Sequence, residues 1–180
     1  MPLVCLLIRS VKYRMGISNT GFQPVRTFRI YKRNLPHWEQ PGGVYFITFR
    51  TVKGVILSDD AKEIVFESIL FHNNKKSKLY AGVVLKDHVH LILQPLEKTK
   101  DAYYSIREIM HSIKSFSANR INRQLKKKGS VWVVESFDRI VRNEKEFIQK
   151  IKYIINNPVK SNLVENIEDY KWIYIVGWGK

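Results

Sequence analysis

The chain has 180 residues and a strongly unbalanced charge, with 31 Lys and Arg against 16 Asp and Glu and a formal net charge of +15. Its length fits one domain, and a hydrophobic content of 44% is enough for a core. A single cysteine, Cys5, excludes an internal disulfide framework, and no apolar run reaches the roughly 18 residues of a membrane-spanning helix. The composition therefore favours a soluble cytoplasmic protein with a polyanionic partner, nucleic acid before an anionic membrane surface or a ribosome.

Residues 1–35 differ from the rest of the chain because they contain seven basic side chains and no acidic one. We expect this segment to form a flexible basic arm, followed by a single folded domain at 36–180. Arg29 and Arg33 in the arm are candidates for contacts with the phosphates or the minor groove of DNA. A start codon assigned too far upstream, which would leave these residues without a role, is the alternative interpretation.

The remaining sequence predicts a succession of strands and amphipathic helices. We expect strands at 44–51, 78–86 and 88–94, helices at 58–76, 103–128 and 143–157, and an extended segment at 131–141. Ser58 is the expected N-cap of the first helix, and Pro158 is expected to end the last one. The tail after it is expected to be irregular. A β-hairpin between two helices predicts an α+β sandwich built on a mainly antiparallel sheet.

Two histidines lie in the apolar stretch KDHVHLILQ at 86–94. Because side chains alternate along a strand, His88 and His90 share one face, and the wholly apolar set on the other face is expected to be the core side. The imidazoles would then point together away from the core, at a spacing that suits shared ligation of a divalent cation. Two half-exposed histidines without a ligand are the alternative. We interpret Asp87, just before them, as a turn residue rather than a hydrogen-bond partner of the site.

The segment KYIINNPVK at 152–160 contains a candidate for the third ligand that two histidines would need. Tyr153 and Asn157 are four residues apart, so they lie on one face of a helix, one turn from each other. Since Pro158 disfavours continued helix, we expect Asn157 at the helix end, where its side chain can reach outward. Tyr153 is either a nucleophile toward phosphorus or an ordinary half-buried tyrosine, one of nine in the chain.

Together, DHVHLIL, the basic helix after it and YIINNPVKSNLV resemble the single-tyrosine HUH transposases, and specifically the REP-associated tyrosine transposases. The resemblance extends to NLPHWEQPGGVYFITFR and VWVVESFDRIVRNEKEF, and so spans residues 32–175. It implies a ferredoxin-like sandwich with the helices packed on one face of the sheet and the HUH motif on a central strand. It also implies that His88, His90 and Asn157 ligate Mg²⁺ or Mn²⁺ and that Tyr153 is the catalytic nucleophile.

By the same resemblance, the domain is a metal-dependent endonuclease and strand transferase that acts on single-stranded DNA at hairpin-associated repeats. Tyrosine attack on a phosphodiester would give a 5′-phosphotyrosine and a free 3′-OH, which conserves the bond energy for rejoining. The expected setting is the prokaryotic cytoplasm at the nucleoid, with single-stranded or hairpin DNA as partner, no membrane, and a monomer or homodimer. A non-catalytic DNA-binding regulator on the same fold is the alternative, and an RNA-binding module with incidental histidines is a third interpretation.

The helix expected at 103–128 is the main candidate for a DNA-binding surface, because it and its exit carry seven basic residues against one acidic residue. The candidate phosphate contacts are Lys114, Arg120, Arg123, Lys126, Lys127 and Lys128. We expect a stripe of Lys114, Ser117, Arg120 and Ile121 to follow the phosphates. Phe116 is expected to face the core, and a solvated helix face without a ligand is the alternative. Candidates for stacking on unpaired bases are Trp38, Trp132 and Phe137, although core packing is the more common role of such residues.

Overall fold

The computed structural model describes residues 29–32, 36–100 and 102–178 of the chain. Its first two strands, β1 (Arg29–Lys32) and β2 (Pro36–Glu39), pair with each other antiparallel. The described part of the expected N-terminal arm is therefore a strand that contains Arg29. The remainder of that arm, including Arg33, lies outside the described residues. None of the helices in the described ranges combines the length and the apolarity needed to cross a membrane.

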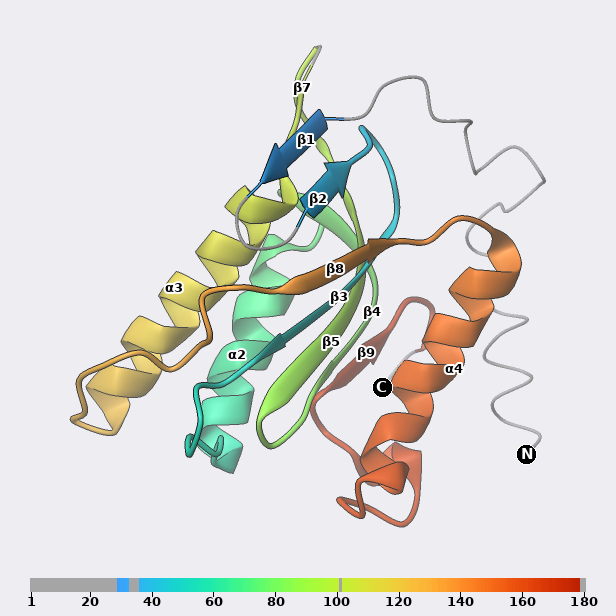
Figure 1. Cartoon of the computed structure of the whole chain (residues 1–180). Coiled ribbons are helices and arrows are strands. Elements are labelled where there is room, and N and C mark those ends of the chain that lie inside the picture. The colour runs from blue at the N-terminus through green and yellow to red at the C-terminus, as the bar shows by residue number, and fades with distance from the viewer. Residues whose placement is uncertain (1–28, 33–35, 101, 179–180) are drawn as a thin grey trace.

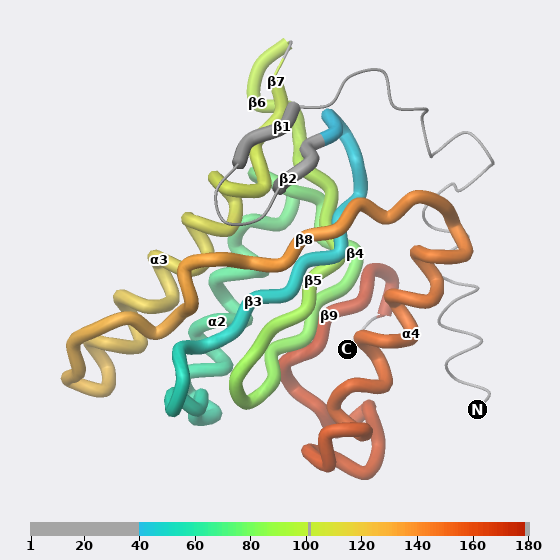
Figure 2. Tube along the Cα trace, in the orientation of Figure 1, coloured from blue at the N-terminus to red at the C-terminus, as the bar shows by residue number. Residues whose placement is uncertain are grey.

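Five strands form one antiparallel sheet in the order β8-β3-β5-β4-β9, which places β5 at its centre (Figures 1 and 2). The strands are β3 (Tyr45–Arg50), β4 (Ser77–Val84), β5 (His88–Pro95), β8 (Phe137–Ile140) and β9 (Ile173–Ile175). The expected strands and the hairpin between β4 and β5 are confirmed, and the two histidines lie on the central strand. A separate small hairpin pairs β6 (Glu97–Thr99) with β7 (Ala102–Tyr103).

Two segments differ from what the sequence predicts. Of the extended segment expected at 131–141, only β8 is a strand of the sheet. The tail, expected to be irregular, contributes β9, in which Ile173 and Ile175 are buried and pair with β4. This short strand alternates in the usual way and fills the free edge of β4, but three residues are too few to stand out in a sequence.

Helices cover both faces of the sheet. α2 (Asp59–His72) and α3 (Ile106–Gln124) pack against each other on one face, whereas α4 (Glu144–Lys160) packs on β4 and β5 from the other face (Figure 1). The predicted α+β sandwich on a mainly antiparallel sheet is confirmed, but the expectation that all helices share one face is wrong. The physical reason is that β5 is buried on both sides, so each face of the central strand needs a cover.

The first helix begins at its predicted N-cap, and both the first and the second helix are shorter than expected. Ser58 caps α2, and its hydroxyl accepts a hydrogen bond from the amide of Ala61. The helix ends at His72 instead of residue 76, since Asn73 adopts an extended conformation and the chain turns into β4. α3 begins only after Ser105, because the β6–β7 hairpin occupies the residues before it.

Proline does not end α4. The helix continues through Pro158 to Lys160, so the prediction that it stops at Asn157 is wrong. Pro158 lies within the last turn, where its missing N–H removes a single helical hydrogen bond. Two hydrogen bonds close the turn: the amide of Ser161 donates to the carbonyl of Asn157, and the amide of Leu163 donates to the carbonyl of Pro158. Asn157 therefore lies inside the helix rather than at a free end.

Candidate active site

The pairing of β3 with β5 places a polar row beside the two histidines. In this register Thr48 lies opposite His90 and Arg50 lies opposite His88, so the four side chains share one face of the sheet. The imidazole rings meet edge-on, with centroids 4.9 Å apart. The predicted alternation is confirmed. The face is not turned away from the core, however, because α4 covers part of it and leaves His90 only 4% exposed.

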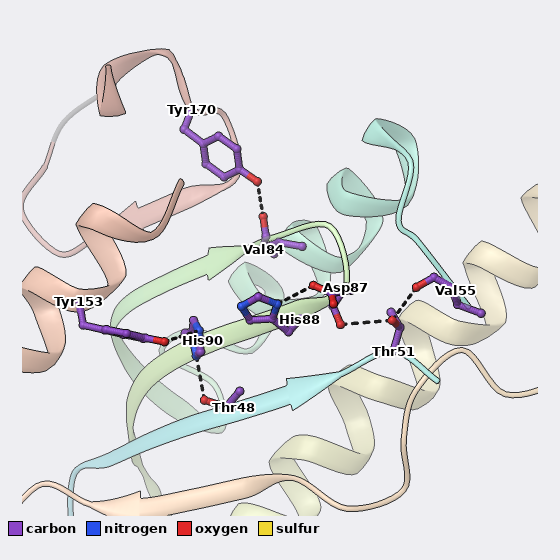
Figure 3. A network of polar contacts seen from close by, with 9 residues as sticks. All are labelled: Thr48, Thr51, Val55, Val84, Asp87, His88, His90, Tyr153 and Tyr170. Atoms are coloured by element: carbon purple, nitrogen blue, oxygen red, sulfur yellow. Dashed lines mark hydrogen bonds and ion pairs between the residues drawn. The ribbon is translucent and has the colours of Figure 1, made fainter. Parts of the chain in front are cut away.

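His90 is held by neighbours on β3. Oγ1 of Thr48 lies 2.8 Å from Nδ1 (Figure 3), and the ring of Phe46 stacks on the imidazole with centroids 5.5 Å apart. Burial lowers the pKa of His90 to about 3, with smaller contributions from His88 and Lys150 in the same direction. The imidazole is therefore neutral at neutral pH, which is the form that ligates a metal ion.

His88 is oriented by the residue just before it. The carboxylate Oδ1 of Asp87 lies 2.6 Å from Nδ1 of His88 (Figure 3). The backbone carbonyl of the same aspartate accepts hydrogen bonds from the amide and the hydroxyl of Thr51, at 2.8 and 3.2 Å. Asp87 thus shapes the β4–β5 turn and also orients His88, so the expectation that it serves the turn alone is wrong. A carboxylate at Nδ1 holds the proton there and leaves the Nε2 lone pair for a ligand.

α4 brings Tyr153 against these histidines. The phenol oxygen lies 3.4 Å from Nε2 of His90, and the two ring centroids are 5.0 Å apart (Figure 3). Residues separated by 63 positions in the chain thus meet at one point. Tyr153 lies at the margin of the buried stripe of α4 and is 44% exposed, so its side chain is only partly covered where it meets the imidazole.

Asn157 follows one turn later on α4 and is nearly buried, at 7% exposure. Its amide nitrogen donates to the backbone carbonyl of Tyr153 at 3.2 Å. This contact orients the side chain and leaves the amide oxygen as the group that can act toward a ligand. Asn157 therefore lies on the same face of α4 as Tyr153, one helical turn later, as their spacing predicts.

The donor atoms of this cluster are of types that ligate divalent cations. With Nδ1 of the two histidines engaged by Thr48 and Asp87, their Nε2 atoms are the candidate ligands, and the amide oxygen of Asn157, one turn after Tyr153 on α4, is the candidate third. Among the described residues, no group of three His, Cys, Asp or Glu side chains is placed to hold a metal ion. A cation here would therefore need the amide, and oxygen atoms of water or substrate, to complete its coordination.

Lys150 belongs to the site although the sequence did not indicate it. Its ammonium lies 4.4 Å from the ring centroid of Phe46 and 6.0 Å from that of Tyr153. The lysine precedes Tyr153 by one helical turn, and so it places a positive charge near the phenol. Lys150 is one of 31 basic residues in the chain. In the sequence, only its position three residues before Tyr153 distinguishes it from the others.

Lys114, a predicted DNA contact, is engaged within the protein. Its ammonium donates to the backbone carbonyls of Val133, Val134 and Glu135 at 3.1, 3.1 and 3.3 Å. Burial lowers the pKa of Lys114 to about 8. The structure therefore uses this lysine to hold the segment that leads into β8.

The stripe expected to follow phosphates along α3 is wrong at two of its four positions. Ser117 and Ile121 are buried, and Phe116, expected in the core, is exposed. The helix is turned so that the row of Ser117 and Ile121 faces inward, which the basic residues around it conceal in the sequence. Arg120 is exposed, but its guanidinium pairs with Glu67 of α2 at 2.6 Å.

The other basic candidates lie at the C-terminal end of α3. The helix ends at Gln124, so the lysines lie in the turn that follows it, where Lys126 has a φ of 50°. Arg123, Lys126, Lys127 and Lys128 are all exposed. They stay predictions as DNA contacts, as does Arg29 in β1, and α3 belongs to the opposite face of the sheet from the histidines (Figure 1).

Comparison with known proteins defines the class of the chain. Residues 47–157 match the model of the family described as Transposase IS200 like. The chain therefore belongs to the IS200-like transposase family, and its role is of the transposase-like, DNA-processing kind.

Two relatives and one solved structure have a more specific description than the family as a whole. A REP-associated tyrosine transposase of Escherichia coli K12 is 24% identical over 72% of this chain and 74% of its own length. A Haemophilus influenzae protein, provisionally assigned as a REP-associated tyrosine transposase, is 26% identical over 77% of this chain and 88% of its own. A REP-associated tyrosine transposase solved in complex with a REP hairpin has a TM-score of 0.64 at 20% identity, covering 83% of this chain and 90% of that one. The resemblance predicted from the motifs is confirmed, and so is the fold.

Proposed function

We propose that this protein is a metal-dependent endonuclease and strand transferase for single-stranded DNA, with Tyr153 as its nucleophile. The observation that carries the proposal is the half-exposed phenol of Tyr153, whose oxygen lies 3.4 Å from Nε2 of His90. A structural tyrosine in the same protein behaves differently: Tyr170 is buried and donates its hydroxyl to the carbonyl of Val84 (Figure 3). Membership of a transposase family supports the same assignment.

His88, His90 and Asn157 would hold the cation, Mg²⁺ or Mn²⁺. When bound, the cation withdraws charge from a non-bridging phosphate oxygen and orients the phosphodiester. Asp87 favours the tautomer of His88 that ligates through Nε2, and Thr48 holds the orientation of the His90 ring. Because Nε2 of His90 has one lone pair, it would hold either the cation or a hydrogen bond from the phenol of Tyr153, and a bound cation would leave the phenol free of that contact.

The covalent step needs neither water nor ATP. The Oη of Tyr153 loses its proton and forms a bond to phosphorus, while the bond between phosphorus and O3′ breaks. O3′ leaves as a hydroxyl, and solvent exchange balances the proton lost by the tyrosine. The products are a 5′-phosphotyrosine and a free 3′ end, and attack by the 3′-OH of a second strand rejoins DNA. Lys150 lies beside the phenol, where its positive charge attracts the incoming phosphate.

We infer that the substrate is hairpin DNA with unpaired flanks, as found at repeats that form hairpins. The structural neighbour that shares the fold was solved with a REP hairpin, and the net charge of +15 supports a polyanionic partner. Binding that depends on basic side chains weakens as salt displaces it from the phosphates, so the affinity should fall steeply with ionic strength.

Capture of the covalent intermediate tests the proposal. The full chain is incubated with Mn²⁺ and a hairpin oligonucleotide that has unpaired flanks and a 3′ label, and the mixture is denatured and resolved on a gel. The label must be at the 3′ end because a 5′-phosphotyrosine retains the DNA downstream of the cut. We expect an adduct in the wild type and none in Tyr153→Phe, which removes only the nucleophilic oxygen. Tyr103→Phe is the matched control, since Tyr103 is also partly exposed and bonds a carboxylate, that of Glu97.

The outcomes separate the alternatives. An adduct that persists in Tyr153→Phe would show that another residue is the nucleophile. Wild-type protein that binds hairpins from every host repeat without forming an adduct would be a non-catalytic regulator. An adduct that forms equally well in EDTA would contradict the need for a cation.

A further inference from the structure

An exposed aromatic residue lies in line with the proposed active site. β8 pairs with β3 so that Phe137 lies opposite Thr48 and Arg139 lies opposite Phe46. Because Thr48 also lies opposite His90 on the other side of β3, Phe137, Thr48 and His90 form one row across three strands. Residues opposite one another in a sheet share a face. Phe137 therefore lies on the same face as the histidines, and it is 54% exposed.

α4 reaches β8 through the ion pair of Glu146 with Arg139 but leaves Phe137 of that strand exposed. The helix packs on β4 and β5, and Phe46 on β3 is buried beneath the edge-on ring of Tyr153. Beyond this point Arg50, Phe137 and Arg139, on the same face, are exposed. In Figure 2, β8 and β3 lie beside α4 rather than beneath it. The half of the face formed by β3 and β8 is thus an open surface that adjoins the phenol.

An irregular segment before β8 sets the position of Phe137. Thr48 pairs with Phe137, and Thr51 pairs with Trp132 in an isolated bridge. From one pair to the other, the first segment has four residues, 48–51, and the second has six, 132–137. The second segment therefore accommodates two more residues than β3 does. Extra residues of this kind re-aim the side chains that follow them. The three carbonyl contacts of Lys114 hold this segment in place.

This combination matches the chemistry of an unpaired DNA strand. Unpaired bases present flat apolar faces that stack on aromatic rings, and their phosphates bind basic side chains. A duplex offers no such face, because its bases already stack on one another. Arg139 is engaged with Glu146 at 3.3 Å, and so Arg50, next to His88 in the pairing register, is the better placed phosphate contact.

We propose that Phe137 is a base-stacking residue for the unpaired strand next to the scissile phosphate, with Arg50 as its phosphate contact. The identity of the neighbouring phosphate rests on the proposed function, but the binding itself is measurable without cleavage. A base held by Phe137 restrains the strand along the row that ends at Tyr153, and so it positions the phosphodiester for attack. A second copy of this chain on the edge strand β8 would be a different occupant of the same surface.

The test compares two oligonucleotides on the full chain. Fluorescence anisotropy in EDTA measures the affinity for a hairpin with unpaired flanks and for the same hairpin with a blunt end. Phe137→Ala should weaken binding of the flanked hairpin about 5–150-fold, the equivalent of about 1–3 kcal/mol per stacked base, and leave the blunt hairpin unchanged. Phe137→Trp should retain the affinity. Phe71→Ala is the matched control, since Phe71 is 61% exposed but lies on α2, at the opposite face.

Single abasic sites in the flanks then locate the contact. One abasic position should weaken binding to the wild type and have no effect on Phe137→Ala, because the stacking partner is already absent. Arg50→Ala should reduce the slope of log affinity against log salt by about 0.7, the loss of one phosphate contact on a single strand. Equal affinities of Phe137→Ala and Phe71→Ala for the flanked hairpin would overturn the proposal. So would a change of oligomeric state in Phe137→Ala, measured by sedimentation, with DNA affinity unaltered.

The two proposals fail separately. If no adduct forms but Phe137→Ala still weakens binding of the flanked hairpin, the catalytic proposal falls and the stacking site stands. If the adduct forms and Phe137→Ala binds like the wild type, the stacking site falls and the catalytic proposal stands.

Discussion

The two faces of the central sheet receive different side chains from the same strand. Toward α2 and α3, β5 contributes Leu91 and Leu93, which are fully buried among apolar neighbours. Toward α4 it contributes His88 and His90, and β3 adds Thr48 beside them. Two helices seal the first face, whereas one helix covers only part of the second. The alternation of a single strand thus separates residues that hold the fold from residues suited to chemistry.

The sealed face is tightly packed. A Cβ at Gly82 of β4 would come within 3.0 Å of Cδ2 of Leu91, so even a methyl group there would require the leucine side chain to shift. The partly covered face instead buries His90 as a neutral imidazole and leaves Tyr153 accessible. Substitutions on the two faces should therefore affect stability and activity separately.

Neighbouring residues of β5 should show the largest effects and the clearest separation. Leu91→Ala should lower the free energy of unfolding by about 2–5 kcal/mol, because it leaves a cavity in the sealed face. Urea denaturation measures this loss, and the adduct formed per folded molecule should stay at the wild-type level. Loss of a residue that orients a metal ligand typically costs about 10–100-fold. His90→Ala removes a proposed ligand itself, so it should reduce adduct formation by more than this. Its free energy of unfolding should fall by less than that of Leu91→Ala.

Coupling of stability and activity across the sheet would contradict this separation of the two faces. Both variants are assayed at a urea concentration where each is fully folded, so that the folded fraction does not enter the result. If Leu91→Ala then lost adduct formation as completely as His90→Ala, the sealed face would also be determining the geometry of the site.

The sequence predicted the residues of the site better than their surroundings. Alternation alone placed His88 and His90 on one face, and helical spacing alone placed Tyr153 and Asn157 one turn apart. Neither pattern contains the long-range register of β3 against β5, which brings Thr48 to His90 across 42 residues. Hydrophobic periodicity also does not predict which face of a sheet a helix packs on.

Charge was the least informative pattern in this chain. A count of basic residues cannot distinguish Lys114, which binds three carbonyls, from Lys126 in an exposed turn. It also could not show that Arg120 is paired with Glu67 or that Lys150 lies beside the proposed nucleophile. These differences arise from tertiary contacts between segments far apart in the chain.

An intermediate effect is expected at Thr48, the support of His90 on the partly covered face. Thr48→Val keeps the shape and the strand preference of the residue but removes the oxygen that lies 2.8 Å from Nδ1. Affinity for Mn²⁺, measured by titration calorimetry without DNA, should fall about 10–100-fold because the imidazole is no longer held in its ligating orientation. Thr48→Ser should restore the affinity. Equal affinity of Thr48→Val and the wild type would mean that Thr48 has no part in holding the ligand.

The smallest effect is expected on the sealed side of the molecule, at the ion pair between Arg120 and Glu67. Both side chains are about half exposed, so Arg120→Ala should lower the free energy of unfolding by about 0.2–1 kcal/mol, and less at high salt. Because the guanidinium is already engaged, the slope of log DNA affinity against log salt should stay unchanged, whereas Arg50→Ala lowers it. Glu67→Gln, which releases Arg120 without removing it, is the control for the ion pair itself. If Arg120→Ala lowered the slope as much as Arg50→Ala, Arg120 would contact DNA in spite of its ion pair, and this residue would serve binding as well as stability.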